Sequence, residues 1–338
     1  MNAKSTPLVT IVLEHSGCHL SDTLWALSKQ STDSQYYEVL VCGPLTDQEQ
    51  NLIASFSDTI KVKSVYLKPS NLANILNSIA SVAKGELLIF SDTNAIPAQD
   101  FVVQHIQNHT KHSSIFAGFV GPRMWENKAQ SSLFQHALNQ CRHKTIYSHY
   151  DNEGIIPWDF VRRGNLSLKK EIITKISFPR ENFETKLGED LEFFYLLWLA
   201  GVRFTYTSDA KTYSITTPTI ESLLKEEEKA GRDIARFINC YNDTALHLTA
   251  MIYLSKEALI VWRSKLEPLL DKYHMLLEGI KESERIFLAD HMKIEHQSKV
   301  TTSIYALEVL LNLTRTSALI DFALSIPSLR SQNTSILH

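Results

Sequence analysis

A short cluster of polar residues in the first half of the chain has the chemistry of a cation or phosphate site. Ser91, Asp92, Thr93 and Asn94 directly follow the apolar run Glu86–Phe90. Asp92 and Asn94 supply oxygen ligands of the kind that hard cations prefer, and a cation held by such a pair can clamp a diphosphate. Asp and Asn are also common in ordinary turns, so a polar connection between a strand and a helix is the alternative interpretation.

A second acidic cluster, Glu189 and Asp190, follows Gly188 at the start of a predicted helix. The helix runs to Ala200, and Gly201 suits its C-terminal end because glycine readily adopts the left-handed conformation found there. Backbone N–H groups at a helix N-terminus favour the ionised form of a carboxylate and fix its direction. That suits a general base that removes a proton from a hydroxyl group. The alternative is the ordinary preference of acidic residues for helix N-termini.

Apolar runs alternate with helix-length stretches through the first part of the chain. This order predicts βαβ units, and therefore an α/β fold with a mostly parallel sheet. Asp92 follows one of the predicted strands, and open α/β sheets bind ligands beyond the carboxyl ends of their strands. The predicted strands are residues 8–13, 37–42, 60–67, 86–90, 115–120 and 202–206, and the helices between them are 21–30, 47–56, 71–83 and 98–109.

The last third of the chain differs in composition, since residues 219–338 contain only two glycines. Several amphipathic stretches there predict an all-helical region. We expect one domain over residues 1–235 and a helical C-terminal region over residues 236–338, which would self-associate or dock on a partner or a membrane surface. The run Glu226-Glu227-Glu228 is typical of a solvated helix face. The predicted helices are 219–240, 244–262, 264–290 and 298–325.

Charge and cysteine usage exclude several classes of protein. The net charge is −3, from 34 basic and 37 acidic residues, which gives no general attraction to nucleic acid. The four cysteines have no Cys-x-x-Cys spacing and indicate reduced thiols instead of a disulfide framework or a zinc site. The apolar runs are too short for a signal peptide or a transmembrane helix. We therefore expect a cytoplasmic protein, and peripheral association with the inner membrane face is compatible with the same features.

Six segments between residues 7 and 235 occur in the order seen in one enzyme family. They are PLVTIVLEHSG, LSDTLWALSKQS, NSIASVAKGE, LLIFSDTNAIPAQDF, GNLSLKKE and FETKLGEDLEFFYLLWLAGVRF. On these segments the chain resembles an inverting family 2 glycosyltransferase. The resemblance implies a three-layer α/β/α domain of GT-A type that transfers a sugar from a nucleotide-sugar donor to a glycan or lipid-linked acceptor. It also implies a hexosyltransferase of polysaccharide biosynthesis, with Mn²⁺ or Mg²⁺ as its cofactor.

The resemblance assigns roles to the residues of both acidic clusters. Asp190 would be the catalytic base that deprotonates the acceptor hydroxyl, and Glu189 would shape the acceptor site beside it. Asp92 would contact the nucleotide sugar, and Asp92 and Asn94 would together hold the divalent metal. Glu14, in the loop after the first strand, would lie near the nucleoside.

Further residues are assigned around these clusters. Asn77 would lie on the donor side, and Gly164 and Asn165 on the acceptor side. Trp158 is either a sugar-stacking platform in the acceptor cleft or an anchor in the core. The pair Arg162-Arg163 would bind a phosphate or an acidic acceptor, or else lie on the surface.

Some positions depart from the family's pattern, all of them around the nucleotide and the metal. Where the family has its second metal-binding Asp, this chain has Asn94, and where the family has a late His ligand, it has Ser214. The Asp that follows the family's second strand is replaced by Cys42 or Gly43, and the Arg before Asn77 is replaced by Leu76. A neutral amide weakens cation affinity because hard cations prefer charged oxygens. A second hypothesis is therefore a binding or scaffold protein whose GT-A domain has lost its donor chemistry. A third class, the nucleotidyltransferases, usually has a Gly-rich basic first loop, which EHSGCHLSD does not provide.

Two histidines offer a separate candidate for metal binding. His105 and His109 are spaced i, i+4 on a predicted helix, so both side chains lie on one face. Such a pair can bind zinc, and the alternative is a solvated helix face.

Overall fold

The chain forms two compact units in the computed structural model. The sheet unit comprises Met1–Glu126, Ile146–Glu181 and Glu192–Thr217, and the helical unit comprises Asn127–Thr145, Asn182–Leu191 and Pro218–His338. The domain boundary predicted at residue 235 lies inside helix α8 (Ile220–Cys240) and stays a prediction. The structure describes residues 8–16, 19–67, 71–125, 154–176, 183–216, 218–241, 256–270, 272–290 and 297–325. The sequence also predicts a helix near residues 131–143, which lies outside these ranges.

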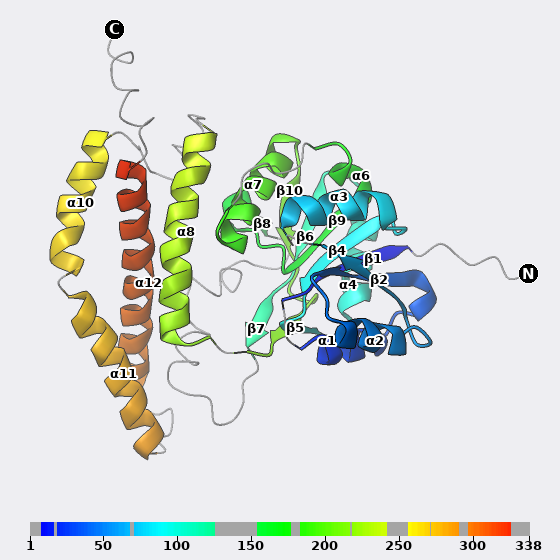
Figure 1. Ribbon diagram of the computed structural model, residues 1–338, viewed down its shortest axis with the longest axis horizontal. Coiled ribbons are helices and arrows are strands. Elements are labelled where there is room, and N and C mark those ends of the chain that lie inside the picture. The colour runs from blue at the N-terminus through cyan, green and yellow to red at the C-terminus, as the bar shows by residue number, and fades with distance from the viewer. Residues whose placement is uncertain are drawn as a thin grey trace, which may run out of the picture. The chain divides into compact units, whose positions relative to one another are not determined.

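An eight-stranded sheet forms the centre of the sheet unit, in the order β3-β2-β1-β4-β9-β6-β10-β8 (Figure 1). Strand β1 pairs in parallel with β2 and β4, β2 with β3, and β6 with β10, whereas β9 is antiparallel to both of its neighbours and β8 is antiparallel to β10. The predicted mostly parallel sheet is therefore confirmed. The strands are β1 (Val9–Glu14), β2 (Tyr37–Gly43), β3 (Lys61–Tyr66), β4 (Leu87–Asp92), β6 (Ala117–Val120), β8 (Ile155–Ile156), β9 (Asn165–Lys169) and β10 (Arg203–Tyr206).

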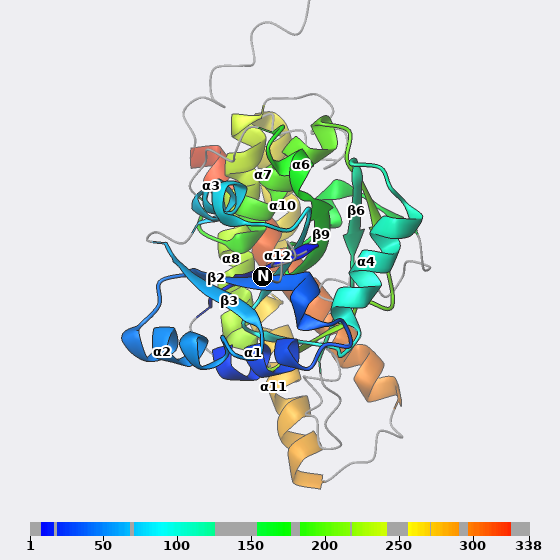
Figure 2. The same cartoon turned by 90° about the vertical axis from the view of Figure 1, so that its right-hand side faces the viewer.

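Helices cover both faces of this sheet, which confirms the three-layer α/β/α architecture (Figures 1 and 2). On one face, Ile11 and Leu13 of β1 pack in a core with Leu24 of α1 and Phe101 of α4. On the other face, Phe90 of β4 meets Phe193 of α7 edge to face, with ring centroids 6.2 Å apart. The helices of the first face are α1 (Leu20–Ser28), α2 (Asp47–Ser55) and α4 (Phe101–Lys111), and those of the second are α3 (Leu72–Val82), α6 (Lys170–Ile173) and the later turns of α7 (Lys186–Leu199).

Gly85 brings the chain into close contact with β1 just before β4 begins. A Cβ atom on Gly85 would lie 2.4 Å from the backbone nitrogen of Thr10. The Gly85 N–H donates to Thr10 Oγ1 at 2.9 Å, and this hydroxyl donates to the buried Glu38 carboxylate at 2.8 Å. The glycine thus allows β1 and β4 to align, and this alignment places the carboxyl ends of both strands side by side.

We expect Gly85→Ala to lower the free energy of unfolding by about 1–3 kcal/mol, because the methyl group must push the backbone of β1 aside. Urea denaturation of the parent and the variant measures this loss. Gly279→Ala is the matched control: a Cβ at Gly279 meets no atom within 4 Å, and alanine is the better helix former. Equal urea midpoints for Gly85→Ala and the parent would contradict the close approach.

The helical unit is built around α12, which lies between α8 on one side and α10 and α11 on the other (Figure 1). A Cβ at Gly231 of α8 would lie 2.2 Å from the carbonyl oxygen of Arg315, so glycine allows α8 and α12 to approach closely. Helix α10 ends at Leu270, beyond the break predicted at residue 263, because it continues through Pro268. The bounds are α10 (Lys256–Leu270), α11 (Tyr273–Asp290) and α12 (Gln297–Ser325).

The predicted solvated face at Glu226-Glu227-Glu228 is wrong for its middle residue. Glu227 is buried against α12, where Arg315 Nε donates to its carboxylate at 2.6 Å. Its charge is therefore neutralised inside the helix pair. Glu228, by contrast, has a 58% exposed side chain and bonds Arg232 one turn further along α8.

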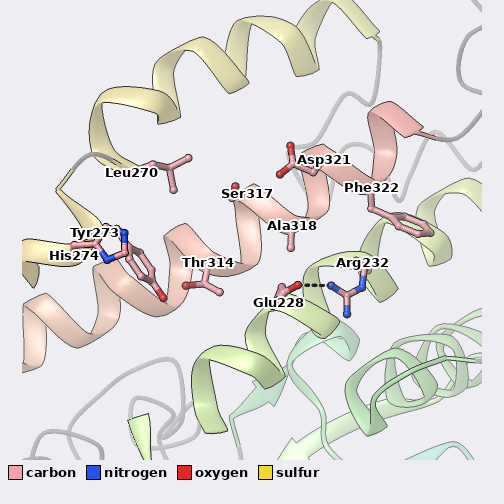
Figure 3. Close-up of a pocket in the computed structure, with 10 residues that line it drawn as sticks. All are labelled: Glu228, Arg232, Leu270, Tyr273, His274, Thr314, Ser317, Ala318, Asp321 and Phe322. Atoms are coloured by element: carbon pink, nitrogen blue, oxygen red, sulfur yellow. Dashed lines mark hydrogen bonds and ion pairs between the residues drawn. The ribbon is translucent and has the colours of Figure 1, made fainter. Parts of the chain in front are cut away.

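A cavity of about 630 Å³ opens between α8, α11 and α12 (Figure 3). Its lining combines the aromatic rings of Tyr273 and Phe322 with the polar side chains of Arg232, His274 and Ser317. None of the described helices combines the length and the apolar character needed to cross a lipid bilayer.

Candidate functional site

Asp92 and Glu14 end two neighbouring parallel strands at the carboxyl edge of the sheet. Asp92 is the last residue of β4, Glu14 is the last residue of β1, and the two are register partners. Register partners in adjacent strands direct their side chains to the same face of a sheet. Asp92 is only 7% exposed. Both carboxylates therefore lie at the same edge of the sheet, as predicted for Asp92, and Glu14 belongs to β1 instead of the loop after it.

Two arginines neutralise these carboxylates. Arg123 Nη1 donates to Asp92 Oδ2 at 2.7 Å, and Arg163 Nε donates to Glu14 Oε2 at 3.2 Å. A Cβ on Gly164 would lie 3.5 Å from Asp92 Oδ2 and 3.4 Å from Arg123 Nη1, so this backbone borders the first pair. We call these five residues the Asp92 cluster. The sequence indicated four of them, whereas Arg123 gave no signal because its partner is distant along the chain.

A second, three-stranded sheet holds Arg123 and Asn94 beside Asp92. Its order is β5-β11-β7, and the register pairs Arg123 with Thr212. The Asn94 N–H donates to Asp92 Oδ1 at 2.9 Å, and the Asn94 carbonyl accepts from the N–H of Ile215 at 3.1 Å. Ser214, the position of the expected late metal ligand, is thereby brought next to Asn94. The strands are β5 (Ala95–Pro97), β7 (Arg123–Trp125) and β11 (Thr212–Ser214).

The donor atoms at this place do not fit a divalent cation. Asp92 is the only carboxylate among the three expected ligand positions, and its two oxygens accept from Arg123 and from the Asn94 backbone. Asn94 and Ser214 offer only neutral oxygens, and the Ser214 hydroxyl donates to the Thr216 carbonyl at 3.4 Å. No group of three or more His, Cys, Asp or Glu side chains suited to a metal occurs in the described part of the chain. The residues at this place therefore do not support a catalytic step through a metal.

Asn77 and Asn165 were predicted at the site but lie outside the Asp92 cluster. Asn77 is exposed in the middle of α3. The Asn165 side chain is buried and donates to the carbonyl oxygens of Ala210 at 2.7 Å and Pro122 at 3.0 Å. Its Oδ1 lies 3.0 Å from His105 Nε2. The Asn165 side chain therefore connects strand β9 to helix α4 and to the loops that contain Pro122 and Ala210.

Trp158 lies among other aromatic side chains of the sheet unit. The side chain is 7% exposed, and its ring lies 5.4 Å from that of Tyr195 and 6.3 Å from that of Trp198, measured between centroids. These ring contacts favour the core anchor, and a role of Trp158 in the acceptor cleft stays a prediction.

His105 and His109 are buried under the sheet, which corrects both the solvated face and the metal pair. Ser167 Oγ lies 2.9 Å from His105 Nδ1 and 3.0 Å from His109 Nε2. Burial disfavours the charged imidazolium and lowers the pKa of His105 to about 3 and that of His109 to about 4. The helix face is polar in sequence yet buried, because its histidines bond to polar residues of β9.

These two histidines predict a loss of stability in mild acid. Both are neutral when folded and protonate near pH 6.5 when unfolded, so the unfolded state binds more protons between about pH 4 and pH 6.5. Stability is therefore complete above pH 6.5 and falls below it, by up to about 1.4 kcal/mol per pH unit for each histidine. Urea denaturation from pH 7 to pH 5 measures the slope. His105→Gln should flatten it, whereas the exposed His274→Gln should not, and equal slopes in all three proteins would refute the assignment.

Glu189 and Asp190 lie at the start of α7, as predicted. Thr185 precedes the helix, and its hydroxyl oxygen accepts from the N–H of Gly188 at 3.1 Å. The Glu189 N–H donates to the Thr185 carbonyl at 3.3 Å. Asp190 is 3% exposed. Both acidic residues belong to the helical unit together with α8, whereas the Asp92 cluster belongs to the sheet unit.

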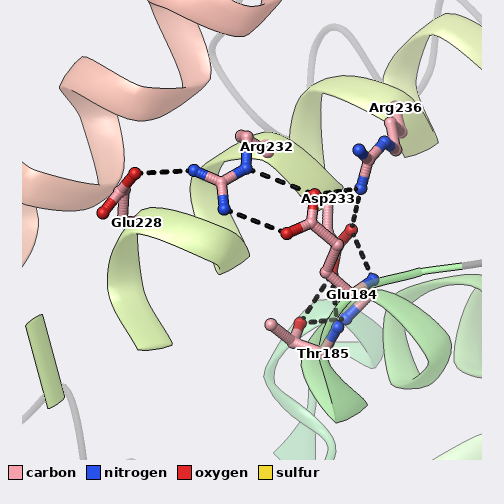
Figure 4. A network of polar contacts seen from close by, with 7 residues as sticks. Glu184, Thr185, Glu228, Arg232, Asp233 and Arg236 are labelled. Atoms are coloured by element: carbon pink, nitrogen blue, oxygen red, sulfur yellow. Dashed lines mark hydrogen bonds and ion pairs between the residues drawn. The ribbon is translucent and has the colours of Figure 1, made fainter. Parts of the chain in front are cut away.

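A polar network from α8 holds the segment that starts α7 (Figure 4). Asp233 is fully buried and accepts from the backbone N–H groups of Glu184 at 3.0 Å and Thr185 at 2.8 Å, and from the Thr185 hydroxyl at 2.7 Å. Arg236 Nη1 donates to Asp233 at 2.9 Å and to Glu184 at 2.7 Å. Arg232 bonds Glu184 at 2.9 Å and lowers the pKa of this carboxyl to about 2. The sequence did not indicate Asp233, because an acidic residue within a helix resembles a solvated one.

A solved structure supports the fold, whereas comparisons of the sequence find no match. No protein-family profile and no curated protein sequence matches the chain. The TarS protein of S. aureus has similar structures: residues 1–349 with UDP-GlcNAc (15% identity, 89% of this chain and 90% of that one, TM-score 0.47), and a longer chain of which the match spans only 42% (TM-score 0.43). The mannosyltransferase PcManGT from Pyrobaculum calidifontis, with GDP-Man and Mn²⁺, is similar at 14% identity over 94% of this chain and 88% of that one, with a TM-score of 0.55. The chain therefore has a GT-A-like fold, similar to that of a mannosyltransferase.

Proposed function

We propose that this protein is a glycosyltransferase that transfers a sugar from a nucleotide-sugar donor to an acceptor hydroxyl, with inversion at the anomeric carbon. The Asp92 cluster carries the proposal: a buried carboxylate ends the central strand of a GT-A-like sheet and holds a partly exposed arginine. Ligands of open α/β sheets bind beyond this edge. The order of the six segments further supports a hexosyltransferase of family 2 type, acting on a glycan or lipid-linked acceptor in polysaccharide biosynthesis.

The chemistry needs two kinds of group at opposite sides of the reacting carbon. Asp190 removes the proton of the acceptor hydroxyl as its oxygen forms a bond to the anomeric carbon. The bond from that carbon to the diphosphate breaks, and the diphosphate leaves with the electron pair. Positive groups fixed before the reaction stabilise the charge that develops on the leaving group. Asp92 orients the donor sugar, Glu189 shapes the acceptor site, and Glu14 borders the nucleoside.

A transfer assay with the full chain tests the proposal. Nucleotide sugars with uracil and guanine bases are incubated one by one with glycan acceptors, and the released nucleoside diphosphate is measured. We expect release from one donor, and its loss in Asp92→Asn. Absence of both turnover and nucleotide binding for every donor would refute the proposal.

A binding or scaffold protein is the second candidate function. The observation that favours it is the engagement of both Asp92 oxygens by Arg123 and by the Asn94 backbone. In addition, Cys42, at a position where the family carries Asp, is fully buried, and burial raises the pKa of its thiol to about 12. Nucleotide binding without any sugar transfer would favour this function over catalysis.

A further inference from the structure

We propose that the guanidinium of Arg123, and not a divalent cation, binds the diphosphate of the donor. The inference rests on the proposed function and adds to it the group that neutralises the leaving diphosphate. Its starting point is the mismatch at Asp92, where the expected metal ligands are neutral and the one carboxylate already holds a cationic side chain.

Arg123 lies where a cation bound to Asp92 would lie. Its Nη1 is 2.7 Å from Asp92 Oδ2, which is the distance of a charge-assisted hydrogen bond. A divalent cation on the same oxygen would meet the positive guanidinium at close range, and like charges so close repel each other strongly. The position beside Asp92 Oδ2 can hold either the guanidinium or a metal ion, and in this structure Arg123 occupies it.

The guanidinium can bind a phosphate without leaving Asp92. Its side chain is 32% exposed, whereas the side chain of Asp92 is only 9% exposed. The bond to Asp92 uses one of the five N–H donors of the guanidinium, and two parallel N–H groups match the oxygens of a phosphate. Asp92 thus holds the guanidinium through Nη1, and the other N–H groups of this partly exposed side chain can bind a ligand.

The surrounding backbone keeps this arrangement in place and open. Arg123 is fixed by the register of β7 with Thr212 of β11. Gly164 borders both members of the pair, because a Cβ atom built on it would lie 3.4 Å from Arg123 Nη1 and 3.5 Å from Asp92 Oδ2. A larger side chain at this position would therefore cover the pair. Arg163 is 5% exposed and is held by Glu14, so it contributes a second, buried positive charge to the cluster.

Calorimetric titration of the full chain with UDP and GDP tests the inference, once with EDTA and once with Mn²⁺. We expect one of these nucleotides to bind in the presence of EDTA. Replacing EDTA with Mn²⁺ should change its Kd by less than about threefold, because the site lacks the charged oxygen ligands that a divalent cation prefers. Arg123→Gln should weaken binding by about tenfold to a hundredfold, the effect of losing charge-assisted bonds. Arg123→Lys keeps the charge without the fork and should be intermediate. Arg203 is an exposed residue of β10, so Arg203→Gln should bind the nucleotide with the Kd of the parent.

The possible results separate the inference from the proposed function. Binding that requires Mn²⁺ would overturn the inference and leave a nucleotide-sugar enzyme intact. Parent-like affinity of Arg123→Gln in EDTA would also overturn it. If neither nucleotide binds under either condition, the inference fails, and the proposed function fails with it when no donor is turned over either. Circular dichroism and thermal denaturation establish that the variants fold. If Arg123→Gln does not fold, the test rests on Arg123→Lys, whose side chain can still bond Asp92.

Discussion

Asp190→Asn is expected to lower kcat for sugar transfer by about 10²- to 10⁴-fold, the contribution of a positioned general base. Asparagine has almost the shape of aspartate, so packing around this 3% exposed side chain should persist. Its amide cannot accept the proton of the acceptor hydroxyl. The loss should therefore fall on kcat, whereas the Kd for the nucleoside diphosphate should change little, because binding the leaving group does not involve the base.

The measurement combines initial rates over a range of donor concentrations with calorimetric titration of the nucleotide. Asp58→Asn is the matched control, since Asp58 is exposed in a turn of the sheet unit and the same chemical change there should leave both constants unaltered. Equal kcat values for Asp190→Asn and the parent would remove Asp190 as the base. A large loss of nucleotide affinity in Asp190→Asn would instead assign this residue to the donor.

The central strands and the place of Asp92 could be predicted because their signals are local. Buried parallel strands appear as continuous apolar runs, and Leu87–Phe90 is such a run that ends directly before the polar cluster. The position of Asp92 at the carboxyl edge then follows from the order of strands and helices. The start of α7 at Glu189 and Asp190 had equally local signals, in the preceding glycine and the acidic pair.

The partners of these residues could not be predicted, because pairing over long distances leaves no pattern in a single sequence. Strand β9 inserts antiparallel between β4 and β6, and it brings Gly164 to Asp92 from far along the chain. Arg123 reaches Asp92 only through β7 and its register with β11. The sequence predicts a surface position for Glu227 and, as one of two alternatives, for His105, because their hydrogen-bond partners in the interior, Arg315 and Asn165, come from other elements.

Asp233→Asn is expected to lower both the stability of the helical unit and the rate of transfer. Both carboxylate oxygens accept backbone N–H bonds, one from Glu184 and the other from Thr185. Whichever way the asparagine amide is oriented, its NH₂ group faces one of these donors, so an acceptor is lost and two donors oppose each other. The expected loss is about 2–4 kcal/mol, as for a buried polar network from which one partner is removed.

The same change should move the residues that follow Thr185 on α7. Asp190 lies five positions after Thr185, and a shift of about 1 Å in a catalytic group costs about a hundredfold in rate. We therefore expect Asp233→Asn to lower kcat by about tenfold to a hundredfold, with the nucleotide Kd unchanged, and urea denaturation to show the loss of stability. Glu228→Gln is the matched control on α8: its exposed pair with Arg232 is worth less than about 0.5 kcal/mol. If Asp233→Asn loses stability but keeps the parent's kcat in the folded fraction, Asp233 supports the fold alone; a selective fall in kcat makes it the residue that positions the base.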